Sequence, residues 1–423
     1  MFSRLDAIGR ESIRLALIVV PIALATGAAC AVFLRLLEEA TQLRFAHPAL
    51  VFGLPFAGIA IAYCYERHGK NSVRGNNLIL EAIHTAREES PDDDSSLVPR
   101  RLAPLILAST VVTHLFGGSA GREGTAVQMG GSLASAWGRL LRLGAKHKRL
   151  ALMCGVSAGF GGVFGTPLAG AVFALEVLWR GRLETEEALF CLLAAMGSDW
   201  CAQALQTHHQ HYSVVYPTTG AGLLDLSLMV KVAFAAVLFG LAARGFVELT
   251  EAIGHFFRSR LANPLARPFV GGWLVVALSF LPGASDYLGL STNSPNSNAV
   301  TLVSAFSQGG ATPFSWAWKT GLTALTLGSG FKGGEVTPLF FVGATLGNAL
   351  SGPLHVQVSL LAAIGFVAVF AGASKTPLAS AIMGIELFGA QGAPLFALAC
   401  FVAMMASGQS GLYSAQKTSK QNL

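Results

Sequence analysis

The stretch GGSAGREGTAVQMG, residues 117–130, places an arginine and a glutamate side by side between glycines. Apolar sequence that is typical of helices runs on both sides of this stretch. A charge at mid-membrane costs about 2.5–3.5 kcal/mol on insertion scales, so charged residues persist there when they are paired or functional. Arg122 and Glu123 are therefore the first candidates for a functional site.

The composition of the whole chain is that of an integral membrane protein. Of the 423 residues, 52% are hydrophobic and 12% are charged, and the mean hydropathy is +0.55, whereas soluble proteins carry about 25% charged residues. We expect no signal peptide, because no short apolar stretch near the start ends in a small-residue cleavage site. The net charge of +6 lies mostly in connections. This distribution argues against nucleic-acid binding and favours Lys/Arg-rich loops on one side of a membrane.

Cysteine and histidine form no convincing metal or disulfide pattern. The cysteines lie scattered, mostly inside apolar runs, and we interpret them as small core residues: Cys30, Cys64, Cys154, Cys191, Cys201 and Cys400. His208, His209 and His211 have no carboxylate or cysteine near them in their polar connector, so a solvated loop explains them better than a metal site. We expect no metal and no cofactor.

The apolar runs fall into two series. We expect an amphipathic surface helix at the cytoplasmic face over 1–14, a first membrane repeat over 15–205, a linker over 206–225, a second membrane repeat over 226–415 and a polar tail over 416–423. Several runs fall short of the roughly 20 residues that span a bilayer, and glycine and proline interrupt them, as in 150–179. Such broken helices are tolerated where protein buries them or where they line a watery cavity. The polar stretch 87–101 is interpreted as a solvated loop.

An internal repeat decides the architecture. TPLAGAVFALE (166–176) returns 210 residues later as TPLASAIMGIE (376–386), with six identities in eleven positions, and GREGT (121–125) returns 212 residues later as GGEVT (333–337). Repeated halves with short, glycine-interrupted apolar segments at matching positions are typical of transporters that bind substrate between the halves near the bilayer midplane. The sequence predicts an all-α polytopic membrane protein with an inverted repeat.

Glu123 and Glu335 take equivalent places in the two halves, each after a glycine-rich segment and before a run that can be helical. The first N–H groups of a helix are unpaired and carry partial positive charge. Two such helix starts that face each other would form an anion site. A carboxylate beside that site can occupy it in place of the anion, and protonation would release it. The alternative is that Glu123 pairs with Arg122 and merely packs.

The motifs resemble those of the CLC anion channels and transporters. GREGT is similar to the GREGP motif of that family, GGEVTP (333–338) falls where the family has GxFxP, and GLYSA (411–415) matches a late tyrosine segment. The resemblance covers about residues 15–415. It implies the CLC-type inverted-repeat fold with broken and re-entrant helices, and a homodimer with a pathway in each subunit.

Departures from the chloride-type pattern resemble the fluoride-exporting branch of the family. SVRGNNLI (72–79) stands where chloride-type members have GSGIP, Val177 stands where chloride exchangers have an inner proton glutamate, and GFKGGEVTPLFF (330–341) is almost the phrase of the fluoride branch. Arg74 falls where an anion-coordinating serine would lie, or a methionine in many fluoride-branch members. It would either attract the anion or turn outward to a headgroup or an acid, and we favour the outward position because a fixed cation would trap the anion.

The resemblance also implies residue roles. Glu123 would exchange anion for proton, Glu335 would be a second glutamate in proton movement, and Tyr413 would donate its hydroxyl to the anion. The remaining anion-binding positions would be Asn76, Asn77, Gly121, Arg122, Gly124, Val336 and Thr337. Fluoride holds water tightly, so a site for it must offer many donors, and helix-start amides, asparagine amides and the hydroxyls of Tyr413 and Thr337 can supply them.

These observations predict a proton-coupled fluoride antiporter that exports fluoride through the inner membrane of a bacterium, in contact with membrane lipid. A chloride/proton exchanger or a passive chloride channel of the same fold is the first alternative. A remote alternative is an intramembrane serine hydrolase, because GGSAG (117–121) matches G-x-S-x-G and His114 is near. Glu176 and Glu386 are expected to be buried, hydrogen-bonded structural residues. The sequence leaves open whether Lys332 and Lys375 line a cytoplasmic mouth or neutralise acids.

Overall fold

The computed structural model describes residues 2–87, 98–207, 209–210, 212–216 and 225–418, with backbone only for 2–10. Parts of the predicted loop 87–101, of the linker 206–225 and of the tail 416–423, together with His208 and His211, lie outside the described residues. Among the described residues, three helical segments are long and apolar enough to cross a membrane, namely Glu11–Ala46, Pro48–Arg74 and Leu226–Arg260. Shorter apolar helices fill the space between them, as the sequence predicts.

The first half of the chain forms eight α-helices in the described residues, and three short helical turns precede α3. The turns are Pro48–Gly53, Tyr65–Gly69 and Lys70–Arg74. The helices are α1 (Phe2–Ala46), α2 (Leu54–Cys64), α3 (Asn76–Arg87), α4 (Leu102–Leu115), α5 (Glu123–Leu140), α6 (Ala145–Phe164), α7 (Pro167–Glu176) and α8 (Ala188–Ala204).

The second half repeats much of this order. Its helices are α9 (Leu226–Arg260), α10 (Ala266–Ser279), α11 (Ser315–Gly328), α12 (Val336–Leu354), α13 (Val358–Ser374), α14 (Pro377–Phe388) and α15 (Ala393–Ala406), with 3-10 turns at Ala284–Tyr287, Ser304–Phe306 and Ala390–Gly392. Helices α5, α6, α7 and α8 therefore have counterparts of similar length in α12, α13, α14 and α15. This order supports the division into two repeats, which stays a prediction.

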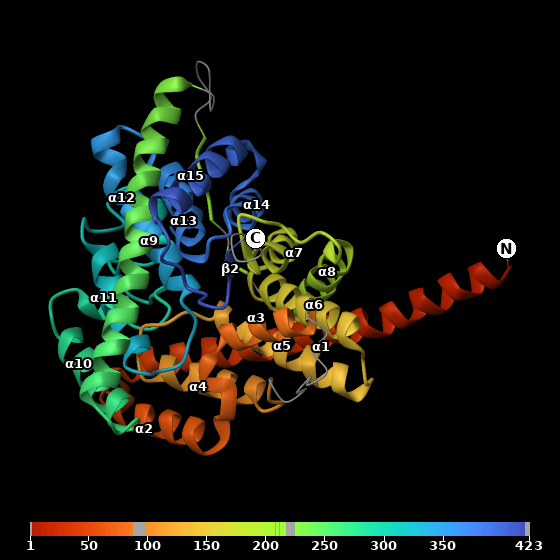
Figure 1. The fold of residues 1–423 in the computed structure, drawn as a ribbon. Coiled ribbons are helices and arrows are strands. Elements are labelled where there is room, and N and C mark those ends of the chain that lie inside the picture. Colours follow the sequence, from red (N-terminus) through yellow and green to blue (C-terminus); the bar gives the residue numbers. More distant parts are fainter. Residues whose placement is uncertain (1, 88–97, 208, 211, 217–224, 419–423) are drawn as a thin grey trace.

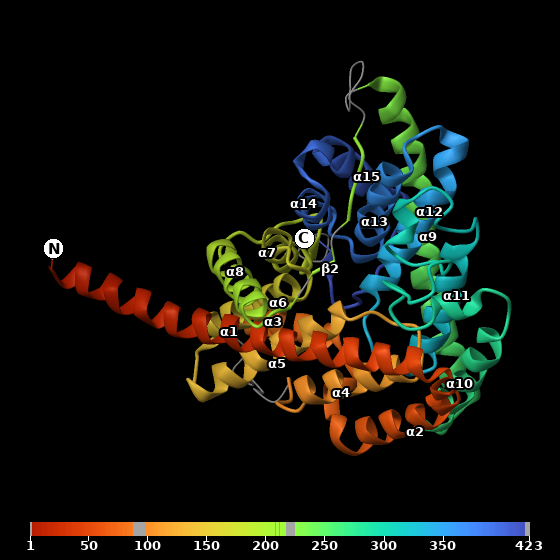
Figure 2. The same ribbon diagram turned by 180° about the vertical axis from the view of Figure 1, so that it is seen from behind.

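The two halves pack against each other along their length. Figures 1 and 2 show α1 to α8 on one side of the molecule and α12 to α15 on the other, with α7 beside α14 at the seam and α10 beside α2. One continuous apolar core joins both halves, and phenylalanine rings of the two halves meet in it: Phe370 stacks on Phe160 and Phe173. Because this apolar core buries them, the broken helices are stable at membrane depth without forming single long spans.

The structure adds detail to three sequence-based expectations about elements. The opening segment is not a separate surface helix but the first turns of α1, which runs without interruption to Ala46 and includes Pro21. The run 150–179 breaks only at Gly165, because Gly155 and Gly159 lie inside α6, where they permit close contact with the backbone of α5. A two-residue parallel sheet also interrupts the all-helical pattern: β1 (Trp179–Arg180) pairs with β2 (Lys417–Thr418).

Candidate functional site

Two helix starts meet at the seam between the halves. Helix α5 begins at Glu123 and α12 begins at Val336. The segments before them form an antiparallel bridge, in which the N–H of Gly121 donates to the Gly334 carbonyl (2.6 Å) and the N–H of Gly334 donates to the Gly121 carbonyl (2.8 Å). The predicted meeting of two helix starts is therefore present. The amide of Gly121 is engaged in this bridge, and its role as an anion contact stays a prediction.

The Glu123 carboxylate occupies the start of the opposite helix. Its side chain is 1% exposed. The carboxylate accepts the Thr337 N–H (2.9 Å), and the Thr337 hydroxyl donates to it at 2.6 Å. The N–H of Arg122 adds a longer contact of 3.2 Å. An N–H in the first turn of a helix has no partner inside that helix and favours negative charge. The carboxylate thus holds the donors that a small anion would use.

Arg122 lies beside this carboxylate, at a longer distance. Its Nε is 3.4 Å from Oε1 of Glu123, and its side chain is 22% exposed. The alternative in which Glu123 pairs with Arg122 is therefore also represented, but the shorter contacts go to Thr337. Arg122 also lines a cavity of about 310 Å3 together with Gln206, Thr207 and His209. A permanent positive charge at the wall of this cavity would attract anions toward the carboxylate.

Gly124 allows two other candidate residues to approach the start of α5. A Cβ atom at this position would lie 3.0 Å from Nδ2 of Asn76 and 3.5 Å from Oε2 of Glu335. Asn76 is the first residue of α3, and its Oδ1 is buried without a hydrogen-bond partner. Glu335 is the residue that precedes α12. Because residue 124 has no side chain, the Asn76 amide of the first half and the Glu335 carboxyl group of the second half can both approach the start of α5.

Asn77 and Tyr413 belong to the same cluster but do different things. Oδ1 of Asn77 accepts the N–H of Ala415 (3.0 Å), so this side chain tethers the segment that carries Tyr413. The Lys417 N–H donates to the Leu178 carbonyl (3.1 Å) and continues the tether into the β1–β2 pair. The first residues of the predicted polar tail thereby hold the buried Tyr413 against α3. Phe173 packs edge-on against its ring.

These groups line a small cavity of about 170 Å3 between the halves. Glu335, Asn76, Asn77 and Tyr413 contribute to its wall, and so do residues that the sequence reasoning missed or left open: Tyr65, Ser72, Gln128 and Lys332. Oγ of Ser72 and Oε1 of Gln128 are buried without a partner. Nζ of Lys332 lies 4.6 Å from the ring centroid of Tyr65. Unpartnered buried polar atoms are costly in a dry site and indicate a place for water or an ion.

Arg74 and Val336 complete the predicted set. The Arg74 guanidinium pairs with Glu81 of α3, and its side chain is half exposed, which places it outward, on an acid, at the rim of the same cavity. Val336 is buried as the first residue of α12, so its N–H is among the donors that the helix itself leaves free. Ser72, rather than the residue at position 74, supplies a hydroxyl to the cavity wall. The sequence did not indicate Ser72 as a site residue, because it lies two positions before the place of the serine in the family motif.

Other residues singled out from the sequence have structural roles. The Glu176 carboxylate accepts the N–H groups of Leu378 (3.0 Å) and Ala379 (2.8 Å) at the start of α14, and Glu386 does the same for Leu168 (2.9 Å) and Ala169 (2.8 Å) at the start of α7. The expected hydrogen bonds are present in both cases; Glu176 is buried as expected, whereas Glu386 is only partly buried.

The residues of the hydrolase alternative do not form a nucleophile site. The Ser119 hydroxyl, fully buried, donates to the Tyr287 carbonyl (3.0 Å) and contacts the Thr323 hydroxyl (2.8 Å). Both ring nitrogens of His114 face backbone carbonyls, those of Thr110 and Ala120. The described residues therefore offer Ser119 no histidine base. His209 packs on Gly165 and lies 3.4 Å from Asp199, and the described residues contain no cluster of three or more metal-binding side chains.

A sequence model described as voltage gated chloride channel matches residues 57–408 of the chain. The chain belongs to the CLC family. As a CLC protein, it is a multi-pass membrane protein that moves ions and is not an enzyme, and its many short, broken helices follow from that fold.

Individual CLC proteins are similar to it over nearly its whole length. A chloride/fluoride channel protein of Pseudomonas syringae pv. tomato is 44% identical over 398 residues, which are 94% of this chain and 84% of that protein. The crystal structure of a CLC-type fluoride/proton antiporter is 35% identical, has a TM-score of 0.88 and covers 97% of this chain and 99% of its own. A slow cyanobacterial Cl-/H+ antiporter, 19% identical with a TM-score of 0.74 over 93% of this chain and 94% of its own, shares the fold.

Proposed function

We propose that this CLC protein is a proton-coupled fluoride antiporter that exports fluoride from the cell. The observation that carries the proposal is the Glu123 carboxylate bound to the N–H and the hydroxyl of Thr337. These are strong, charge-assisted hydrogen bonds. A fluoride ion and this carboxylate compete for the same donors, so the arrangement couples the position of the anion to the charge on one side chain.

The exchange follows from this competition. When a proton binds Glu123, the neutral carboxyl group loses its electrostatic preference for the start of α12. The Thr337 N–H and hydroxyl then turn to a fluoride ion, and Asn76 and Tyr413 supply further donors from the cavity wall. When the proton leaves, the carboxylate returns and displaces the anion. The Glu123 side chain thus couples the two movements. It carries a proton while fluoride is bound, and it displaces fluoride when the proton leaves.

Glu335 is placed to receive the proton on the other side of the seam. It lines the small cavity together with Tyr413, while Arg122, the neighbour of Glu123 in the chain, lines the larger one. Val177 is buried in the core at the end of α7 and carries no proton, so Glu335 would replace the inner glutamate of chloride exchangers. An acidic exterior would then drive protons inward and fluoride outward, and the cell would resist fluoride.

The similarity to a CLC-type fluoride/proton antiporter over 97% of the chain supports fluoride as the substrate. A chloride/proton exchanger or passive chloride channel is the second candidate, because a relative at 44% identity is described as a chloride/fluoride channel protein. The two differ in what a measurement of flux would show. A passive channel moves the anion without protons, and a chloride exchanger prefers the larger ion.

The decisive experiment uses the protein reconstituted in liposomes that are loaded with fluoride or with chloride. A fluoride or chloride electrode records anion release while a pH dye records proton entry. We expect fluoride release to exceed chloride release and protons to move in the opposite direction. Glu123→Gln should leave protein folding intact and abolish proton movement. Equal or greater chloride release would transfer the protein to the chloride group, and unchanged coupling in Glu123→Gln would remove the proposed gate.

We also propose a homodimer in a bacterial inner membrane, surrounded by lipid. Helices α8, α7, α14 and α15 lie next to one another in this order. Large apolar side chains on these helices are exposed: Leu168, Leu189, Leu193, Met196, Leu378, Phe401 and Met405. An apolar face of this kind fits a second copy of the chain, and the similar proteins from bacteria support the location. Cross-linking of a cysteine introduced at Leu193 in native membranes tests the dimer.

A further inference from the structure

A separate cavity of about 510 Å3 lies away from the seam, where α1 ends and the next span begins. It is formed by the end of α1, the turn Pro48–Gly53, the end of α10 and the loop that follows Tyr287. The candidate spans Glu11–Ala46 and Pro48–Arg74 meet at this point. A junction of two membrane spans lies near the membrane surface, at the depth of the lipid headgroups. None of the residues assigned to ion exchange contributes to this cavity.

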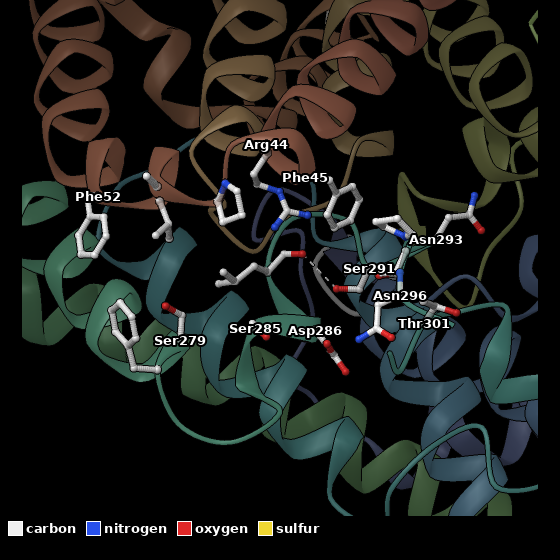
Figure 3. A pocket seen from close by; sticks show the side chains of 17 residues that line it. Arg44, Phe45, Phe52, Ser279, Ser285, Asp286, Ser291, Asn293, Asn296 and Thr301 are labelled. Carbon is white, nitrogen blue, oxygen red and sulfur yellow. Dashed lines mark hydrogen bonds between the residues drawn. The ribbon is translucent and has the colours of Figure 1, made fainter. Parts of the chain in front are cut away.

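Arg44 is the positively charged residue that lines this cavity. Figure 3 shows its guanidinium pointing inward from the end of α1, with Phe45 beside it, and its Cζ lies 4.4 Å from the centroid of that ring. Nε of Arg44 is buried and has no hydrogen-bond partner. The described residues offer its guanidinium neither a carboxylate within 4 Å nor a hydrogen bond. Cations inside membrane proteins are normally paired with an acid or with backbone carbonyls. The partly buried Arg44 has the Phe45 ring beside it but no such oxygen partner.

Room for the guanidinium is made by a glycine of the facing loop. A Cβ atom at Gly289 would lie 3.5 Å from an Arg44 terminal nitrogen, and the φ of Gly289 is +63°. Lys319 satisfies this loop from behind, because its Nζ donates to the Gly289 carbonyl (2.7 Å) and to the Ser291 hydroxyl (3.0 Å). Lys319 thus binds the Tyr287 and Gly289 carbonyls, and Arg44 faces the open cavity.

The remaining walls divide into an apolar and a polar side. Figure 3 shows Phe52 on one side of Arg44 and Asn293 and Asn296 on the other. The rings of Phe52 and Phe280 are 5.8 Å apart and mostly face outward, with exposures of 46% and 67%. Aromatic side chains of this kind are typical of the membrane interface. An acyl chain would lie against this aromatic side, while the asparagines offer donors to a headgroup.

Asp286 is the acid that lines this cavity, and it does not neutralise Arg44. Its Oδ2 accepts the N–H of Val300 (2.9 Å), which fixes the carboxylate on the loop opposite α1. Figure 3 places it away from the guanidinium. A ligand that suits both groups carries a negative charge for Arg44 and hydroxyl donors for the region of Asp286, Asn293 and Asn296.

We infer that this cavity binds an anionic phospholipid, with the phosphodiester on Arg44, an acyl chain along Phe52 and Phe280, and a hydroxylated headgroup toward Asn293 and Asn296. The combination of an unpaired cation, an aromatic wall and a position between two spans matches a lipid rather than a free anion. Basic pockets between membrane helices bind anionic lipid headgroups through charge complementarity at the membrane surface.

The test measures which lipids stay on the purified protein. The protein is exchanged into detergent that contains equal amounts of phosphatidylglycerol and phosphatidylcholine, and the bound lipids are counted by native mass spectrometry. We expect wild type to retain phosphatidylglycerol in preference to phosphatidylcholine, and Arg44→Gln to lose this preference by about tenfold, as the loss of a charge-assisted hydrogen bond predicts. Arg260→Gln, which removes an exposed arginine at the end of α9, is the matched control and should retain it.

A second variant keeps Arg44 intact. Ala49 is exposed and lines the cavity, so Ala49→Trp fills the space and should also lower phosphatidylglycerol retention. Phosphatidylglycerol should raise the Tm of wild type more than that of Ala49→Trp, since a ligand stabilises the folded state that binds it. Equal retention of both lipids, or unchanged retention in both variants, would refute the site. Displacement of the lipid by millimolar inorganic phosphate would identify a free-anion site instead. No part of this test depends on fluoride transport.

Discussion

Glu176 and Glu386 cap each other's helices. Each carboxylate lies at the end of one short helix and accepts two N–H groups at the start of the other, so that α7 and α14 are joined at both ends. The two residues stand at equivalent positions of the internal repeat. In a bilayer these N–H groups have no water to bind, and each unsatisfied group costs several kcal/mol. The pair therefore fixes the seam beside which the ion pathway lies.

Removing one of these carboxylates should destabilise the protein without changing its chemistry. Glu176→Gln keeps the shape but loses the charge that favours the helix start, and we expect a loss of about 1–3 kcal/mol of stability. The measurement is thermal unfolding in detergent, with fluoride flux of the folded fraction as the second readout. Glu251→Gln, at an exposed position of α9, should leave the Tm unchanged. A reduced flux at normal Tm would instead make Glu176 part of the pathway.

Thr337→Val tests the donors that hold the gate carboxylate. The valine lacks the hydroxyl that donates to Glu123 at 2.6 Å but keeps the size of the side chain. We expect fluoride flux to fall by about tenfold or more, since one charge-assisted hydrogen bond is lost both to the carboxylate and to the anion. Thr345→Val is the matched control in the same helix, because the Thr345 hydroxyl donates to backbone carbonyls of its own helix, those of Phe341 and Val342. Equal effects of the two variants would contradict the role of Thr337.

Gly124→Ala tests the approach of Asn76 and Glu335 to the start of α5. The added methyl group would lie 3.0 Å from Nδ2 of Asn76, so the amide must move away from the cavity. We expect a folded protein with strongly reduced fluoride flux. Gly352→Ala makes the same change in α12, where no atom lies within 4 Å, and should transport normally. Normal flux in Gly124→Ala would show that the position of Asn76 does not matter.

Asn77→Ala should act on Tyr413 through the chain that carries it. Without Oδ1 of Asn77 the Ala415 N–H loses its acceptor, and the tyrosine hydroxyl is held less firmly at the cavity. We expect weaker fluoride binding, seen as a raised KM for flux, with proton coupling retained. Tyr413→Phe removes the hydroxyl itself and should have the same effect without loosening the segment. If Asn77→Ala changes stability but not KM, its role is only to hold the fold.

The sequence alone was sufficient to predict the fold class and the meeting of two helix starts. Charged residues in apolar surroundings identified Glu123 and Glu335, and the repeat showed that they belong to opposite halves. The contact of Glu123 with Thr337 follows from these two facts, because helix starts leave their first N–H groups free. The bridge of the Gly121 N–H to Gly334 could not be predicted, because no pattern in one sequence reveals that partner.

Other features depended on contacts between residues far apart in the chain. The sequence predicted that the glycines of α6 interrupt the helix. A glycine inside a helix costs only about 1 kcal/mol relative to alanine, however, and the close packing of Gly155 and Gly159 on α5 offsets this cost. The sequence did not indicate Ser72 and Gln128, because only the fold brings their polar atoms together at the wall of one cavity. Arg44 gave no signal at all, since an arginine at the end of a helix is ordinary.

The 214 residues that separate Glu123 from Thr337 have a consequence for how the protein is made. While the chain is being synthesised, the first helix start exists before the second has left the ribosome, and Tyr413 is added later still. A partly synthesised chain in the membrane therefore contains the Glu123 carboxylate but no complete ion pathway. The contact between Glu123 and Thr337 can form only after both residues have been synthesised.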